Sequence, residues 1–313
     1  MDTRKITTVI DHTAVGKRID VWLTERFTYY SRHQWQKLIK EGLLLVNNKK
    51  IRASKKLQIG EIIDFYPQND EPDVNTEFSI IYEDEFIYAV NKPHSLPCHP
   101  AGPYFNNTLW KLLQDSGREV FFVNRIDRET SGVVLVAKQG KIAGLSTANI
   151  IEKKYNVIVY GSFPEKLLTE GYLFERSGIS RNDMLKVRKK RFFSYSKPDC
   201  LCETAKTNFS LINYNGKYSM LEAELFTGRM HQIRATLNSL GFPLLGDKLY
   251  GPDETVFIRF INDEITIEDE NMLVLSRQAL HAKSISFTHP INNTVLNITA
   301  PLHSDMQALF PTL

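Results

Sequence analysis

Four charged residues stand directly before an apolar run near the middle of the chain: Arg125, Asp127, Arg128 and Glu129. The apolar run, residues 133–137, is rich in β-branched residues and predicts a strand buried on both faces. The charged residues are therefore expected on a loop at the mouth of a core strand, which can present a reactive carboxylate on a rigid support. Asp127 is the candidate. The alternative is a structural ion pair of Asp127 with Arg125 or Arg128.

The stretch around Asp127 resembles the His-Arg-Leu-Asp-x-x-Thr-Ser-Gly signature of the RluA-type pseudouridine synthases. In this chain it reads Asn124-Arg125-Ile126-Asp127-Arg128-Glu129-Thr130-Ser131-Gly132. The resemblance implies that Asp127 is the essential carboxylate of an enzyme that isomerises uridine in RNA. One residue departs from the signature, because Asn124 stands in place of the usual His. Asn keeps its hydrogen-bonding capacity but does not titrate.

Two further stretches carry the same resemblance. The first, Thr227-Gly228-Arg229-Met230-His231-Gln232-Ile233-Arg234, is similar to the family's Thr-Gly-Arg-x-His-Gln-Ile-Arg motif and implies that Arg229 pairs with Asp127. The second, Lys153-Lys154-Tyr155, implies that Tyr155 stacks on the target base, with Arg125 filling the space that the base leaves. Without the resemblance, Arg229 would be a surface cation and Tyr155 a core or edge residue.

A basic unit precedes these motifs. Residues 16–66 contain eleven Lys and Arg against five Asp and Glu, a net charge of +6, whereas the whole chain carries +3. Two predicted helices, each with an apolar face, are followed by short strands at residues 43–46 and 62–66. This pattern resembles an S4-type RNA-binding domain. The residues expected to contact RNA phosphates are Arg18, Arg32 and Lys37.

The remaining pattern predicts an α+β fold. A mixed, mainly antiparallel β-sheet with flanking helices would form the catalytic domain, and a small α/β S4-like domain would precede it. The expected boundaries are residues 14–66 for the S4-like domain, 67–77 for an acidic, proline-bearing linker and 78–313 for the catalytic domain. Residues 171–206 show no clear pattern. Their basic run contains Lys189 and Lys190, which either are solvated or contact RNA phosphates.

Composition excludes several other classes. The sequence has no membrane-spanning apolar run and no signal peptide, and its three cysteines show no disulfide framework, which favours a reducing, cytoplasmic setting. The spacing of His94, Cys98 and His99 matches no zinc pattern, so no metal is expected. Pseudouridine formation by this family requires no cofactor. We expect a monomer whose partner is ribosomal or transfer RNA.

Two other functions remain open from the residues. The first is a catalytically inactive RNA-binding protein, for which the substitution at Asn124 is the support. The second is a glycosidase, which would need Glu129 as a second acid beside Asp127, although the spacing sets no distance between the two carboxyl groups.

Overall fold

The computed structural model describes residues 5–27, 30, 32–66, 71–101, 103–175, 190–262 and 264–311. The chain divides into two compact units. The small unit comprises residues 1–74 and 97–115, and the large unit comprises residues 75–96 and 116–313. Although the sequence predicts residues 97–115 as part of the catalytic domain, they group with the small unit. The carboxylate of Glu71 accepts hydrogen bonds from the backbone amides of Phe105, Asn106 and Asn107 there.

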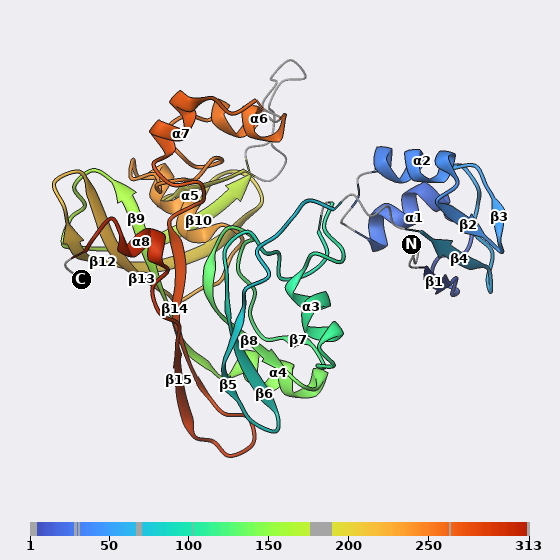
Figure 1. The fold of residues 1–313 in the computed structure, drawn as a ribbon, viewed down its shortest axis with the longest axis horizontal. Coiled ribbons are helices and arrows are strands. Elements are labelled where there is room, and N and C mark those ends of the chain that lie inside the picture. The colour runs from blue at the N-terminus through green and yellow to red at the C-terminus, as the bar shows by residue number, and fades with distance from the viewer. Residues whose placement is uncertain are drawn as a thin grey trace. The chain divides into compact units, whose positions relative to one another are not determined.

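The small unit contains a four-stranded sheet and two helices around one apolar core (Figure 1). The strand order is β1-β4-β2-β3, and the elements are β1 (Ile6–Val9), α1 (Ile19–Arg26), α2 (Arg32–Glu41), β2 (Leu44–Val46), β3 (Lys49–Lys50) and β4 (Ile62–Phe65). The apolar faces expected from the sequence are buried, with Trp22 and Leu23 on α1 and Trp35 and Leu38 on α2. The residue type of Ser31 favours it as the N-cap of α2, but Ser31 lies outside the described residues. The short helix α3 (Leu109–Asp115) also belongs to this unit, and Thr108 caps it, since Thr108 Oγ1 accepts from the amide of Lys111.

The large unit is built on one eleven-stranded sheet. Its main path runs β11-β10-β12-β13-β9-β14-β8-β6-β5, with β15 paired to β14 and β7 to β8. The strands are β5 (Ser79–Glu83), β6 (Ile87–Lys92), β7 (Phe121–Phe122), β8 (Ser131–Ala137), β9 (Ile150–Tyr160), β10 (Lys166–Glu175), β11 (Arg191–Ser194), β12 (Cys202–Tyr214), β13 (Tyr218–Leu225), β14 (Leu280–Thr288) and β15 (Val295–Thr299). The helices are α4 (Gly140–Ala148), α5 (Gln232–Ser239), α6 (Thr255–Ile261), α7 (Ile267–Leu273) and α8 (Ser304–Gln307). All pairs are antiparallel except β8 with β14, so the predicted α+β class is confirmed.

Three features differ from the sequence prediction. Strands β10, β11 and β12 lie in or reach into residues 171–206, the stretch that showed no clear pattern. In β10, exposed and buried residues alternate, and the exposed face carries charge. The strand therefore has no continuous apolar run by which the sequence could reveal it. The sequence favours a helix over residues 141–151, but α4 ends at Ala148 and β9 begins at Ile150. Thr227 has a residue type that favours an N-cap, but it does not cap α5, because its hydroxyl donates to Gln232 Oε1 and the N-cap residue is His231.

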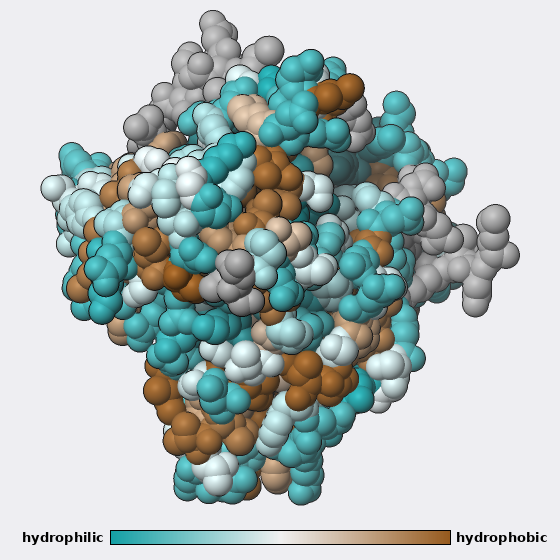
Figure 2. Space-filling view, turned by 60° about the vertical axis from the view of Figure 1, so that its left-hand side comes forward, coloured by the Kyte–Doolittle hydropathy of each residue, from teal (hydrophilic) through white to brown (hydrophobic). Residues whose placement is uncertain are grey.

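Hydrophobic side chains also reach the surface of the large unit. Ile151 on β9 is 59 % exposed and Val295 on β15 is 67 % exposed. Figure 2 shows that hydrophobic residues on the face in view form patches separated by hydrophilic ones. Within the described ranges, every helix is too short or too polar to cross a lipid bilayer.

The parallel pair β8 and β14 brings two distant loops together. The pairing places His281 opposite Ser131 and Ala282 opposite Gly132. Gly132 has φ +109°, and a Cβ atom there would lie 2.2 Å from the carbonyl oxygen of Ala282, so a side chain at this position would force the strands apart. The close approach sets the loop before β8, which carries Asp127, beside the residues that precede β14.

Candidate active site

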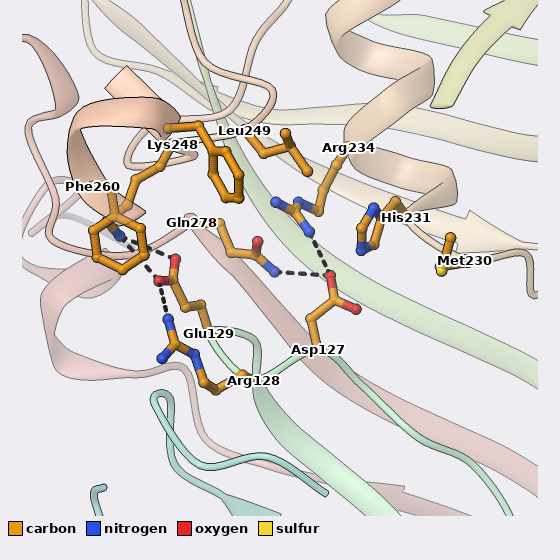
Figure 3. A pocket seen from close by; sticks show the side chains of 11 residues that line it. Asp127, Arg128, Glu129, Met230, His231, Arg234, Lys248, Leu249, Phe260 and Gln278 are labelled. Carbon is orange, nitrogen blue, oxygen red and sulfur yellow. Dashed lines mark hydrogen bonds and ion pairs between the residues drawn. The ribbon is translucent and has the colours of Figure 1, made fainter. Parts of the chain in front are cut away.

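Asp127 lies on the loop between β7 and β8, at the mouth of the buried strand, as the sequence predicts. Its side chain is 34 % exposed. Oδ2 accepts a hydrogen bond from Arg234 Nη1 at 2.8 Å and a weaker one from Gln278 Nε2 at 3.3 Å (Figure 3). Gln278 also donates to Thr130 Oγ1 at 2.6 Å. The carboxylate is therefore held on one oxygen, while the side chain remains accessible from a cavity.

Arg234 is held in turn by a second, fully buried carboxylate. Its Nε and Nη2 donate to the two oxygens of Asp247 at 2.6 and 2.9 Å, which leaves Nη1 for Asp127. Oδ1 of Asp247 also accepts hydrogen bonds from the backbone amides of Leu249 and Tyr250. The guanidinium carbon of Arg234 lies 4.9 Å from the centroid of the Tyr250 ring. Backbone amides hold Asp247, and Asp247 holds Arg234. The ion pair with Arg234 therefore fixes the position of the Asp127 carboxylate before substrate binds.

The electrostatic environment keeps Asp127 ionised. Burial alone would raise the pKa of the Asp127 carboxyl, but the positive charge of Arg234 and the hydrogen bonds from Gln278 and Arg234 outweigh it, so the pKa lies below its ordinary value. Burial would likewise raise the pKa of Asp247 and lower that of Arg234. The ion pair between the two groups outweighs burial, so the pKa of Asp247 is lowered and that of Arg234 is raised. Burial also lowers the pKa of the neighbouring His231 to about 4, so its imidazole is neutral at pH 7.

The expected pairing of Arg229 with Asp127 is wrong. Arg229 Nε donates to the carbonyl of Thr204 at 3.2 Å, and its Nη1 lies 3.5 Å from a Glu203 oxygen. The reason is the start of α5 at Gln232. Arg229 precedes the helix, whereas Arg234 lies within its buried first turn and faces the Asp127 loop.

Three functional side chains were therefore missed from sequence: Arg234, Asp247 and Gln278. The sequence does not mark Arg234, because its burial becomes visible only in the structure, where all residues of α5 from Gln232 to Leu237 are buried. A charged residue among them must have a buried partner. No sequence pattern marks Gln278 either, since its role depends on the pairing of β14 with β8.

Two cavities adjoin Asp127 and share the residues Asp127, His231 and Arg234. The smaller cavity, of about 80 Å³, also contains Tyr155, Arg229 and Arg125 in its lining. Tyr155 is on β9, is 9 % exposed and packs in the apolar cluster beneath the sheet. The larger cavity, of about 370 Å³, is bounded instead by Leu249, Phe257 and Phe260. The structure thus brings together all the predicted catalytic residues, although Arg234, and not Arg229, is the arginine in direct contact with Asp127.

The structure shows the contacts of Glu129 and Asn124, the two residues on which the alternative functions depend. Lys248 Nζ lies 3.1 and 3.2 Å from the two carboxylate oxygens of Glu129, and Arg128 Nη2 lies 3.1 Å from one of them. Glu129 therefore accepts hydrogen bonds from two cations, which is unsuited to a general acid. The side chain of Asn124 bonds the backbone of β8, with Oδ1 accepting from Leu135 N and Nδ2 donating to the Val133 carbonyl. The side chain at position 124 therefore forms hydrogen bonds to the backbone of β8, and these bonds do not require a titrating group.

The remaining predicted residues belong to other elements of the chain. Arg18 and Arg32 both bind the buried carboxylate of Asp20 and stay 44 % and 51 % exposed. Lys37 is exposed on α2. Lys190 is 11 % exposed and pairs with Glu254 at 2.8 Å, and Lys189 lies outside the described residues.

Metal-ligating side chains meet at a different place from the one considered in the sequence. Among the described residues, the group close enough to hold an ion is His94, His303 and Asp305. Both oxygens of Asp305 accept from the buried guanidinium of Arg277, at 2.7 and 2.8 Å. An ion pair of this kind satisfies Asp305 without a metal.

Comparison with known proteins identifies the large unit and the basic unit separately. The family model for RNA pseudouridylate synthase matches residues 87–239, and that for the S4 domain matches residues 17–63. The chain is 30 % identical over 316 residues to an uncharacterised RNA pseudouridine synthase, YlyB, of Bacillus subtilis, covering 95 % of this chain and 94 % of the relative.

Two further relatives and one solved structure extend the comparison. The chain is 29 % identical to ribosomal large subunit pseudouridine synthase D of Zymomonas mobilis, over 100 % of this chain and 98 % of that one. It is 32 % identical to the mitochondrial tRNA pseudouridine(32) synthase of Saccharomyces cerevisiae, over 76 % of this chain and 51 % of that one. The fold is similar to that of human RNA pseudouridylate synthase domain containing 1, with a TM-score of 0.54, 21 % identity and coverage of 74 % and 86 %.

Proposed function

The chain belongs to the RNA pseudouridylate synthase family, and we propose that Asp127 is the carboxylate with which it isomerises a specific uridine of structured ribosomal or transfer RNA. The observation that carries the assignment is the ion pair of Asp127 with Arg234 at the mouth of a cavity. The pair keeps the carboxylate charged and fixes its direction. The family membership supplies the reaction, and the geometry supports the choice of residues.

The reaction breaks the bond between C1′ of the ribose and N1 of uracil and makes one between C1′ and C5. The product is an isomer of the substrate, and the proton leaves C5 while N1 gains one. An ionised carboxylate beside the sugar and the base can act as a nucleophile or accept a proton. Asp127 meets this requirement because both Arg234 and Gln278 bond its Oδ2, which leaves Oδ1 to face the nucleotide.

Tyr155 and Arg125 receive roles in binding the target nucleotide. The uridine must leave its stack to reach a recessed carboxylate. Tyr155 lines the smaller cavity beside Asp127 and would stack on the uracil ring. Arg125, on the same loop as Asp127, would fill the space that the uridine leaves in the RNA. Arg229, which lines the same cavity, would attract the phosphate next to the uridine.

The basic unit would hold the RNA outside the catalytic cavity. We assign this role to residues 14–66, with residues 67–77 as the linker and 78–313 as the catalytic domain, apart from residues 97–115, which group with the small unit. Asp20 fixes Arg18 Nε and Nη2 and Arg32 Nε at 3.0 Å each, so these guanidinium groups are oriented while their side chains stay exposed. Oriented, exposed cations of this kind suit phosphate contacts, which position RNA without reading its sequence. Lys37 and Lys189 would add charge, whereas Lys190 is engaged with Glu254.

Mapping pseudouridines in RNA from cells with and without the gene tests the function. Sites that lose the modification name the substrate, and ribosomal or transfer RNA is the expected class, as the names of the relatives suggest. An unchanged map would contradict the proposal. We further propose a monomer acting in the cytoplasm without a cofactor. All three cysteines, Cys98, Cys200 and Cys202, are free thiols, which suits a reducing compartment.

A further inference from the structure

The larger cavity has a wall that the chemistry assigned to Asp127 does not use. Helix α6 contributes Phe257 and Phe260, which are three residues apart and therefore project from one face of the helix. Both side chains are half-buried, and Leu249 extends the apolar surface. Figure 3 shows Phe260 and Leu249 across the cavity from Asp127. A volume of about 370 Å³ lies in the range of small-molecule sites.

The aromatic wall is bordered by positive charge. The Nζ of Lys248 lies 4.8 Å from the centroid of the Phe260 ring, and the guanidinium carbon of Arg128 lies 6.0 Å from it. The cavity lining holds three cations, Arg128, Arg234 and Lys248, against two carboxylates. Aromatic rings beside an excess of cations are the combination that binds a nucleotide, because the rings stack on the base and the cations attract the phosphate.

The wall is held in place without a ligand. Arg259 Nε donates to Asp269 Oδ2 of α7 at 2.7 Å, and its Nη2 lies 3.2 Å from Asp253. Asp269 in turn forms a capping box with Thr266 at the start of α7. These bonds fasten α6 to α7. The aromatic face is therefore a preformed surface, which reduces the entropy lost on binding.

We propose that Phe257 and Phe260 stack on the base of the nucleotide adjacent to the target uridine, with Lys248 and Arg128 attracting its phosphate. The inference rests on the proposed function. The larger cavity shares Asp127, His231 and Arg234 with the smaller cavity that contains Tyr155. Because neighbouring nucleotides are covalently joined, a uridine held at Tyr155 brings its neighbour close to Asp127, where the larger cavity adjoins the smaller one. Helix α6 lies beyond residue 239, where the match to the family model ends.

The test uses a fluorescent adenine analogue, 2-aminopurine, whose emission falls when it stacks on an aromatic ring. Two single-stranded RNA nonamers, each with one uridine, carry 2-aminopurine on its 5′ or its 3′ side. We expect the full-length protein to quench one of the two. Phe257→Leu and Phe260→Leu should each raise the concentration needed for quenching about tenfold, since a base stack contributes a factor of this order. The matched control is Phe121→Leu, because Phe121 is 40 % exposed on β7 and lines neither cavity.

The outcomes separate this inference from the function it rests on. Quenching at neither position, or quenching equal in the wild type and both α6 variants, would overturn it. Asp127→Asn should retain the quenching because it removes chemistry and not the wall. An Asp127→Asn protein that still formed pseudouridine would instead overturn the proposed function and leave the quenching result standing. If the two leucine variants unfold at the same temperature as the wild type, a loss of quenching reflects a local change at the aromatic wall and not unfolding of the protein.

Discussion

Arg234 and Asp127 are 107 residues apart in the chain, and their Nη1 and Oδ2 atoms lie 2.8 Å apart. The ion pair joins the first turn of α5 to the loop before β8. It depends on Asp247, which accepts from Nε and Nη2 of the guanidinium and directs Nη1 outward. The arrangement aims this remaining nitrogen at the carboxylate that we assign to the reaction.

Exchanging each of the two motif arginines for lysine distinguishes their roles. Arg234→Lys removes the forked pairing with Asp247 and the fixed position of Asp127, so the rate of pseudouridine formation should fall by about 100-fold. Its free energy of unfolding should fall by about 2 kcal/mol, because a charged hydrogen bond is removed from a buried site. Arg229→Lys keeps a cation at the cavity edge, and its turnover should stay within about threefold of the wild type. A larger loss of turnover in Arg229→Lys than in Arg234→Lys would show that the assignment is reversed.

The pH dependence of stability should reveal three histidines whose pKa values are lowered in the folded chain. Burial lowers the pKa of His94, His231 and His281 to about 4 in the folded chain, against an ordinary value of 6.5. The unfolded chain therefore binds more protons between these values, and stability falls as the pH drops from about 6.5 to about 4, by at most about 1.4 kcal/mol per pH unit for each histidine. Asp127 and Asp247 have lowered pKa values, so the stability they add is lost only as the pH falls further, below 3.8.

Urea denaturation at a series of pH values measures this directly. A constant free energy of unfolding between pH 6.5 and 4.5 would contradict the burial of the histidines. His281→Gln provides the matched comparison, because it removes one of the three titrating groups. Between pH 6.5 and 4.5, the free energy of unfolding of this variant should change less steeply with pH than that of the wild type. The difference should reach at most about 1.4 kcal/mol per pH unit, which corresponds to one proton.

RNA affinity should depend on salt through the basic unit. Replacing Arg18 and Arg32 by Gln removes two exposed cations, and the slope of log affinity against log salt should become shallower by about 0.7 to 0.9 for each phosphate that is no longer bound. Filter binding of total ribosomal RNA between 50 and 200 mM salt measures the slope. The matched control, Lys217→Gln, removes an exposed charge from the turn between β12 and β13. Equal slopes for the double variant, the control and the wild type would show that Arg18 and Arg32 do not touch RNA.

The sequence predicts those parts of the site that depend on local pattern. Asp127 could be placed because an apolar run marks its strand. Tyr155 is singled out only by the resemblance of Lys153-Lys154-Tyr155 to the family, and it lies in the middle of β9. The partner of Asp127 could not be placed, because the choice between Arg229 and Arg234 depends on where α5 begins. That start is set by the left-handed backbone of His231, at φ 56°, and not by a side-chain cap.

Tertiary packing decides the rest of the site. Gln278 reaches Asp127 only because Gly132 lets β14 run against β8. The residues of α6 showed no pattern that tied them to the cavity, since Phe257 and Phe260 would serve equally in an ordinary core. Their position follows from the hydrogen bond of Arg259 with α7, which joins residues of two short helices.

Asp127→Asn tests the central assignment most directly. Returned to cells that lack the gene, this variant should leave unmodified every uridine that the wild type converts, and the purified protein should be folded and should bind RNA like the wild type. Asp199→Asn, at an exposed carboxylate between β11 and β12, is the matched control and should restore the full pseudouridine map. If Asp127→Asn restored the map as the control does, Asp127 would not be the reacting carboxylate and the proposed active site would be wrong.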